Sequence, residues 1–217
     1  MKQFFMNMYH KPQFWKRFFA CLLAVCIMGF CVSWLNLIAL GADPCSCMNF
    51  GLSSALGMSF GNWQALLNCC LFILVIIWGR DNIGFGTLMN MFLVGYSCDF
   101  TTWLREKLWP DFAFSSLGAR VFWMLIVLVV FVFAVAVYMS VELGTAPYDA
   151  IPIMISQKQN KVSFRLIRIA FDGIVTLIAI GFHATVGVVT ILMVFTIGPC
   201  AQFVKKHIEK FFRKSAD

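Results

Sequence analysis

The sequence predicts an all-α membrane protein, a polytopic helical bundle of six long spans plus two short helices that glycine and proline interrupt. Three observations support this fold class. The composition is 61% hydrophobic and only 12% charged, which excludes a soluble domain with a polar surface. Several charge-free segments reach the ~20 residues that a helix needs to cross a hydrocarbon core of roughly 30 Å. The second half of the chain also repeats a pattern of the first half.

The charged residues indicate which side of the membrane holds the chain ends. Basic residues gather before the first charge-free segment and after the last one, namely Lys2, Lys11, Lys16 and Arg17, and Lys205, Lys206, Lys210, Arg213 and Lys214. This is the positive-inside pattern, so we expect both termini in the cytoplasm. The net charge of +7 needs no nucleic-acid partner, because topology and attraction to anionic lipid explain it.

Shifting the sequence by 103 residues aligns it with itself without a gap. The segment "ALGADPCSCMNFGLSS" falls on "ELGTAPYDAIPIMISQ", and "IGFGTLMNMFLVGYSCDF" falls on "VGVVTILMVFTIGPCAQF". Coincident glycines, prolines and threonines are not expected of two unrelated apolar segments. We therefore predict two tandem repeats, 18–104 and 120–204, a connecting loop at 105–119, and basic tails at 1–17 and 205–217. Two residues 103 positions apart are termed counterparts.

Each predicted repeat contains the same elements in the same order. A long span runs into an LGxxP break, a short segment follows, and two more spans complete the repeat. The breaks contain Gly41 and Pro44 in the first repeat and Gly144 and Pro147 in the second. The expected long spans are 18–39, 62–79 and 84–103, then 120–142, 164–182 and 185–204, and the expected short segments are 45–58 and 147–158.

Whether the short segments cross the membrane decides how the repeats are related. If they cross, the repeats are parallel, and if they dip and return, the repeats are inverted. The charge count favours crossing, because dipping would place Arg105, Lys107 and Arg120 on the outer face. Length favours dipping, because the short segments have too few apolar residues to span alone. We expect crossing on the charge count, and both arrangements place the basic loop 157–161 in the cytoplasm.

Several short motifs carry a resemblance to a known family. They are the repeated LGxxP, FGNW at 60–63, GFGTL at 84–88 and IGPCAQF at 197–203. With these motifs the chain resembles the YczE/YyaS/YitT group of bacterial integral membrane proteins, and in particular its YczE-like branch. The resemblance implies a multi-pass protein of the bacterial cell (inner) membrane with a transport-like or accessory role. One departure is that Cys45-Ser46-Cys47 stands where the second break has Tyr148-Asp149-Ala150.

Paired glycine and proline breaks are the strongest sequence indication of a transporter's binding site, because broken helices expose free backbone groups near the membrane midplane. Asp149, beside Tyr148, closely follows the second break. It could cap the short helix, or it could be a buried carboxylate that carries a proton or binds a cationic ligand. Glu142, before the break, could face the same site or lie at the membrane interface.

Other polar residues within the expected spans are also candidates for the site. Arg168 and Asp172 are four residues apart on an expected helix, so they share a face and could form an ion pair. An ion pair inside a span either fixes helix packing or belongs to a functional site. Side chains that could line a polar cavity or bond between helices are Asn68, Asn90, Thr87 and Thr190.

The sequence contains no Walker-type GxxxxGK[ST], HExxH or GxGxxG pattern. We therefore expect no enzyme activity, no cofactor and no metal site. The leading hypothesis is a small secondary transporter or exporter of a small organic solute, with proton coupling as an option. Its expected partners are the lipid bilayer, the solute and, in a homodimer, a second copy. The alternative hypothesis is an accessory membrane protein that binds or stabilises a partner protein and transports nothing.

Overall fold

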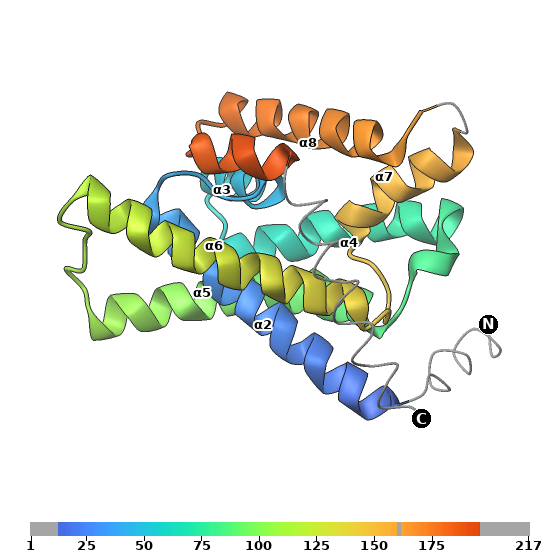
Figure 1. Cartoon of the computed structure of the whole chain (residues 1–217), viewed down its shortest axis with the longest axis horizontal. Coiled ribbons are helices and arrows are strands. Elements are labelled where there is room, and N and C mark those ends of the chain that lie inside the picture. Colours follow the sequence, from blue (N-terminus) through green and yellow to red (C-terminus); the bar gives the residue numbers. More distant parts are fainter. Residues whose placement is uncertain (1–12, 160–161, 196–217) are drawn as a thin grey trace.

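The computed structural model describes residues 13–159 and 162–195, and all regular structure in these ranges is helical (Figure 1). In chain order the elements are α2 (Phe14–Ile38), α3 (Pro44–Leu56), α4 (Phe60–Trp78), the 3-10 helix η1 (Arg80–Asn82), α5 (Phe85–Leu108), α6 (Leu117–Ser140), α7 (Pro147–Lys158) and α8 (Phe164–Gly181). Residues 188–195 are helical as well. The predicted all-α class is confirmed.

The observed boundaries differ from the predicted ones at the helix ends. Helix α2 begins at Phe14 rather than at 18, and α5 continues to Leu108 rather than ending at 103. The loop between α5 and α6 is therefore 109–116 instead of 105–119, because the charged last turn of α5 consists of good helix formers. The basic tails and the end of the predicted span 185–204 lie outside the described residues.

The chain has the surface and the helices of a membrane protein. Three helices, α2, α4 and α6, are long and apolar enough to cross a membrane. Large apolar side chains are exposed on these same helices, for example Leu23, Ile77 and Val129. Such exposure suits contact with lipid tails rather than with water. The predicted membrane class is therefore confirmed.

The two predicted breaks lie directly after α2 and α6. Gly41 and Gly144 have φ angles of 103° and 110°, in the left-handed region that glycine adopts without a steric penalty. Pro44 and Pro147 are the first residues of α3 and α7, where the missing N–H costs no helical hydrogen bond. The chain therefore turns from each long helix into a short one of 13 or 12 residues.

Helices α2 and α6 pack against each other in opposite directions (Figure 1). Arg17, near the start of α2, donates a hydrogen bond of 3.0 Å to the carbonyl of Val141, just after α6. Arg120, near the start of α6, donates a hydrogen bond of 2.7 Å to the carbonyl of Ile38, at the end of α2. The two arginines are counterparts, and so are the two acceptors. Counterpart helices therefore run antiparallel.

This packing contradicts the parallel arrangement that the charge count favours. Parallel repeats would run α2 and α6 in the same direction. The charge count misleads because Arg120 caps a helix: besides Ile38, it donates to the carbonyl of Ala39 over 2.9 Å. These are carbonyls that the end of α2 leaves without helical partners. A basic residue that is engaged in this way is a poor topology signal.

A second set of contacts joins each break to the opposite half of the chain. The carbonyl of Leu143 accepts a hydrogen bond from the N–H of Gly86 over 2.7 Å, and the carbonyl of Leu40 accepts one from the N–H of Val189 over 3.4 Å. Gly84 also touches the Leu143 carbonyl so closely that no room remains for a Cβ atom. Backbone groups of one half therefore hold the break of the other.

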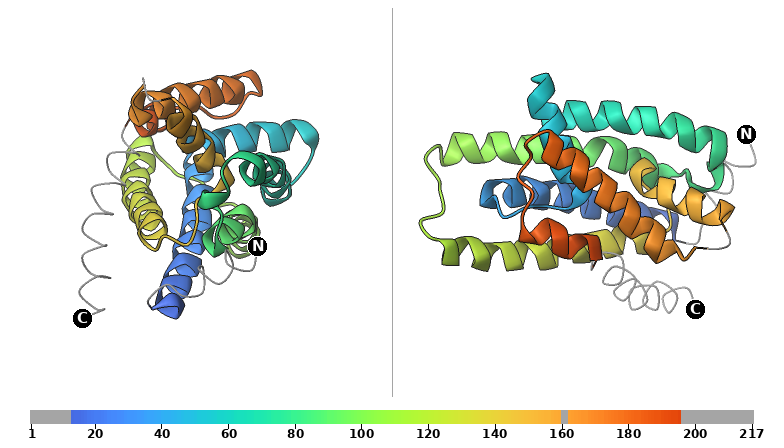
Figure 2. Two further views of the ribbon diagram at one scale, coloured as in Figure 1. Left: turned by 90° about the vertical axis from the view of Figure 1, so that its right-hand side faces the viewer. Right: turned by 90° about the horizontal axis from the view of Figure 1, so that it is seen from above.

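The short helices also pack across the two halves. Helix α3 packs on α8, and α7 packs on α4, so that each short helix contacts a long helix from the opposite half (Figure 2). Helices α3 and α7 are counterparts, as are α4 and α8. At the breaks, the long helices and the short helices, a contact between two elements thus occurs a second time between their counterparts.

Gly84→Ala is expected to destabilise the protein, because the new Cβ would overlap the carbonyl of Leu143, which the N–H of Gly86 holds in place. Overpacking of this kind costs roughly 1–3 kcal/mol, so the midpoint of thermal unfolding in detergent should fall. Gly173→Ala is the matched control, because a Cβ added there meets no atom within 4 Å. Equal stability of the two variants would contradict the close packing at Gly84.

Candidate solute cavity

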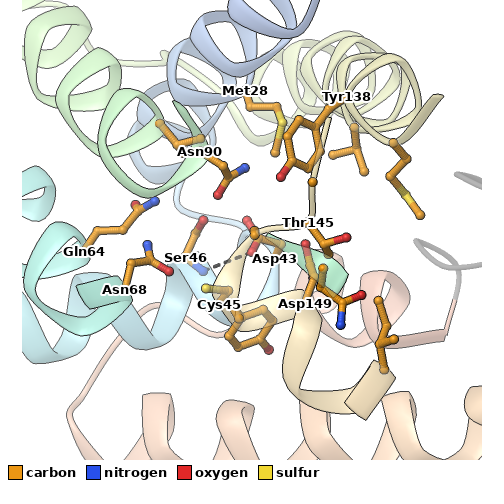
Figure 3. A pocket seen from close by; sticks show the side chains of 18 of the residues that line it. Met28, Asp43, Cys45, Ser46, Gln64, Asn68, Asn90, Tyr138, Thr145 and Asp149 are labelled. Atoms are coloured by element: carbon orange, nitrogen blue, oxygen red, sulfur yellow. Dashed lines mark hydrogen bonds between the residues drawn. The ribbon is translucent and has the colours of Figure 1, made fainter. Parts of the chain in front are cut away.

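A cavity of about 590 Å³ lies between the two halves of the chain (Figure 3). The long helices α2, α4, α5 and α6 form part of its wall, and the N-terminal ends of α3 and α7 face it. Its volume lies within the range of roughly 300–1,000 Å³ that is usual for pockets that bind small molecules. The polar side chains labelled in Figure 3 include Asp43, Ser46, Gln64, Asn68, Asn90, Tyr138, Thr145 and Asp149.

The structure brings most of the predicted site residues together. Six of them line the cavity, namely Asn68, Asn90, Glu142, Tyr148, Asp149 and Arg168. Asp172 is fully buried behind this wall, where it contacts Tyr148 and Arg168. Most of the residues that the sequence singles out thus lie in one region of the fold, and their role as a site stays a prediction.

Thr87 and Thr190 do not line the cavity, contrary to one of the two roles considered for them. The Thr87 hydroxyl accepts a hydrogen bond from the N–H of Gly84 over 3.0 Å, and the Thr190 hydroxyl accepts one from the N–H of Gly187 over 3.4 Å. Each threonine thus satisfies a free N–H group where a helix begins. Both side chains are fully buried in this capping role.

A charged cluster forms one wall of the cavity. The guanidinium of Arg168 donates to Asp149 over 2.6 Å through Nη1 and to Asp172 over 2.8 Å through Nε. The hydroxyl of Tyr148 donates to the other oxygen of Asp172 over 2.7 Å, and Arg168 lies over the Tyr148 ring. The ion pair predicted from the four-residue spacing is therefore present. Asp149 binds Arg168, and among the described residues no side chain caps the N-terminus of α7.

Sequence reasoning missed Asp43, which is the N-cap of α3. Its Oδ1 accepts a hydrogen bond from the N–H of Ser46 over 3.0 Å. Its Oδ2 is buried and has no hydrogen-bond partner in the described part of the chain. The signal was an acidic residue between Gly41 and Pro44, inside the first break. Comparison of the halves obscured it, because the counterpart of Asp149 is Ser46.

Three amide side chains face the cavity from α4 and α5: Gln64, Asn68 and Asn90 (Figure 3). All three are buried, and among residues 13–159 and 162–195 none of their side chains has a hydrogen bond to another residue. An amide offers two donors and an acceptor. The wall opposite the charged cluster can therefore bind a polar ligand without first breaking bonds within the protein.

The cavity reaches the surface beside η1, near the start of α2. Asp81 and Glu142 are exposed there, and both belong to the lining. A carboxylate oxygen of Glu142 lies 3.8 Å from Arg17. Glu142 thus lies at the mouth of the cavity. The sequence left open whether it faces the site or lies at the membrane interface, and at the mouth it faces the site while staying exposed.

Residues 57–61 read GMSFG, which fits the GxSxG pattern of serine hydrolases. In those enzymes the serine follows a strand and has a histidine partner. Here Ser59 lies between α3 and α4 and serves as the N-cap of α4, with its hydroxyl accepting from the N–H of Asn62. The match is thus explained by helix capping.

These features define a membrane protein whose described residues form helices around a polar cavity. Residues 15–206 match the family of unknown function DUF6198, and the chain belongs to this family. It is 25% identical over 190 residues to the "Uncharacterized membrane protein YczE" of Bacillus subtilis, covering 87% of this chain and 84% of that protein. It is 22% identical to "Uncharacterized protein YyaS" of the same organism over 190 residues, 88% of this chain and 92% of that protein.

An "Uncharacterized protein" of Haemophilus influenzae is 27% identical over 182 residues, which cover 84% of this chain and 80% of that protein. No solved structure matches the chain significantly. The relatives named YczE and YyaS confirm the family that the motifs predicted.

Arg168→Gln is expected to destabilise the protein, because Asp172, whose side chain is 0% exposed, would lose its counter-ion. Removing one partner of a buried ion pair typically costs about 3–5 kcal/mol. Adding Asp172→Asn should recover most of this loss, since a neutral amide needs no counter-ion. Thermal unfolding in detergent compares the two variants, and a double variant no more stable than Arg168→Gln would contradict the pairing.

Proposed function

We propose that this protein is a small secondary transporter of a small organic solute, built from two inverted repeats. The observation that carries the proposal is the position of the cavity between counterpart surfaces. Five pairs of counterparts line it together: Met28 and Phe131, Val32 and Val135, Asp43 and Ala146, Cys45 and Tyr148, and Ser46 and Asp149. Secondary transporters of inverted-repeat architecture bind their substrates at such an interface, next to broken helices.

The paired contacts support the two repeats. Three contacts each occur twice, once between two residues and once between their counterparts. They are the hydrogen bonds of Arg17 and Arg120 to helix-end carbonyls, those accepted by the carbonyls of Leu40 and Leu143, and those accepted by the hydroxyls of Thr87 and Thr190. Antiparallel counterpart helices imply an axis in the membrane plane, which is the inverted arrangement. An odd number of spans in each repeat follows, because only then does the second repeat enter from the opposite side.

Six spans satisfy this requirement. The three apolar helices α2, α4 and α6 would be joined by α5, α8 and the helix that begins at 188, while α3 and α7 would enter without crossing. Helix α8 can lie in the bilayer despite Arg168 and Asp172, because these charges pair and face the protein. With both termini in the cytoplasm, the cavity mouth at Asp81 and Glu142 would face the cytoplasm.

A closed counterpart of this mouth supports transport. A pit of about 10 Å³ lies at the other end of α2, lined by Leu35, Asn36, Ala39, Gly41, Ala42, Cys47, Phe50 and Thr185. All of these residues except Cys47 have their counterpart in the lining of the large cavity. Counterpart residues thus line an open mouth near the start of α2 and a closed pit near its end. Exchange of the two conformations would open the cavity to the opposite side.

Flux measurements test the proposal directly. Proteoliposomes should take up at least one solute from a panel of small amines, carboxylates and neutral compounds faster than protein-free liposomes do. Asp149→Asn should slow this flux about tenfold or more, because the variant loses the charged contact to Arg168. Asp111→Asn, in the exposed loop before α6, is the matched control and should leave the flux unchanged. No flux for any solute would favour an accessory role instead.

Thiol labelling tests whether the closed pit opens. Thr145, at the open mouth, and Ala42, in the pit, are counterparts. In sealed membrane vesicles, Thr145→Cys should react with an impermeant thiol reagent from the cytoplasmic face. Ala42→Cys should react from the outer face, more slowly. Intact-mass spectrometry counts the adducts relative to the native protein. If Ala42→Cys never reacts from outside, the cavity is a one-sided chamber and transport is excluded.

A further inference from the structure

The geometry points to a small organic cation with N–H donors, a protonated amine, as the ligand of the central cavity, with Asp43 as its counter-ion. This inference rests on the proposed role of the cavity as a solute site. It goes further in naming the chemical class of the solute and the group that binds it.

The charges around the cavity disfavour an anion. Among the described residues of the lining, Asp43, Asp81, Glu142 and Asp149 are acidic, and Arg168 is basic. Arg168 has little charge to offer a ligand, since it already donates to Asp149 and to the buried Asp172. The described lining therefore offers a ligand the carboxylate of Asp43, and its positive side chain is already paired.

The helix dipoles add positive charge around the cavity, but the net charge there stays negative. The N-termini of α3 and α7 each contribute about half a positive charge to the cavity. Together with Arg168 they amount to about two positive charges, against the three carboxylates Asp43, Asp149 and Asp172. About one negative charge remains, even before Asp81 at the mouth is considered, while Glu142 is offset by Arg17.

Asp43 is an acidic lining residue with an unused carboxylate oxygen, and Asn49 adds a second buried oxygen without a partner among the described residues. Asp43 lines the cavity, is 9% exposed, and uses only Oδ1 to cap α3. Oδ2 has no donor within the described ranges, and a buried carboxylate oxygen without a partner is costly. An ammonium group supplies both the N–H donor and the opposite charge that this oxygen lacks.

The rest of the lining suits the organic part of such a ligand. The aromatic residues Phe131 and Tyr138 belong to the lining, and ring faces attract ammonium groups. Met28, Val32 and Val135 supply apolar surface beside them. Carboxylate, aromatic and apolar groups thus surround one space, as recognition of an organic amine requires.

Binding of matched probes to the purified protein tests the inference. The probes are 2-phenylethylammonium, the neutral 2-phenylethanol and the anionic phenylacetate, and the measurement is titration calorimetry in detergent. The ammonium compound should bind about tenfold or more tightly than either analogue. Asp43→Asn should weaken its binding about tenfold to hundredfold, because the variant lacks the charge. Asp111→Asn, outside the cavity, should bind like the native protein.

Asp43→Asn is a suitable variant because asparagine is as good an N-cap as aspartate, so α3 should still form. A second variant, Tyr138→Leu, introduces the side chain that its counterpart Leu35 has in the other half. It should weaken binding of the ammonium compound about three- to tenfold and leave binding of 2-phenylethanol nearly unchanged. Equal binding of all three probes, or tighter binding of phenylacetate, overturns the inference.

The two proposals can fail separately. Flux of a carboxylate or a neutral solute without binding of the ammonium probe would overturn the cation site and leave the transporter intact. Tight, Asp43-dependent binding of the ammonium probe without flux of any amine would overturn transport and retain the cation site.

Discussion

The fold depends on how the backbone carbonyls at the ends of α2 and α6 obtain hydrogen-bond donors. A helix that ends inside an apolar environment leaves its last carbonyls unpaired, and lipid offers no donor. Arg17 and Gly86 satisfy the carbonyls after α6, while Arg120 and Val189 satisfy those after α2. All four donors come from the opposite half. The same hydrogen bonds therefore hold the breaks in place and keep α2 and α6 antiparallel, and the cavity lies beside them.

The two halves share the backbone arrangement but differ in the chemistry of the cavity. The glycines, prolines, arginines and threonines that shape and hold the breaks recur in both halves. Several polar groups that face the cavity do not recur, since Asp43 has Ala146 as its counterpart, and Asn68 and Asn90 have Phe171 and Met193. Backbone geometry restricts the first set strongly, whereas a lining position accepts any side chain that fits. The two breaks are therefore alike in backbone structure, while the side chains that line the cavity differ between the halves.

Sequence reasoning predicted the local features of this fold and missed the long-range ones. Apolar segments and LGxxP breaks are visible in the sequence, and so is the spacing of Arg168 and Asp172. The direction of α6 relative to α2 was not visible, because it depends on Arg120 binding carbonyls 82 positions away rather than on its charge. Asp43 was missed for a similar reason: only the assembled cavity shows that one of its oxygens lacks a donor.

The contacts at the breaks also bear on how the chain folds while it is being made. The carbonyl of Ile38 accepts a hydrogen bond from a side chain 82 residues further along the chain. The carbonyl of Leu40 accepts one from the N–H of Val189, which is synthesised later still. Until the ribosome has supplied the second half, the carbonyls of Ile38 and Leu40 lack these two donors. Water or the insertion machinery must satisfy them during that interval. The half-made chain is therefore the form in which misfolding and proteolysis should concentrate.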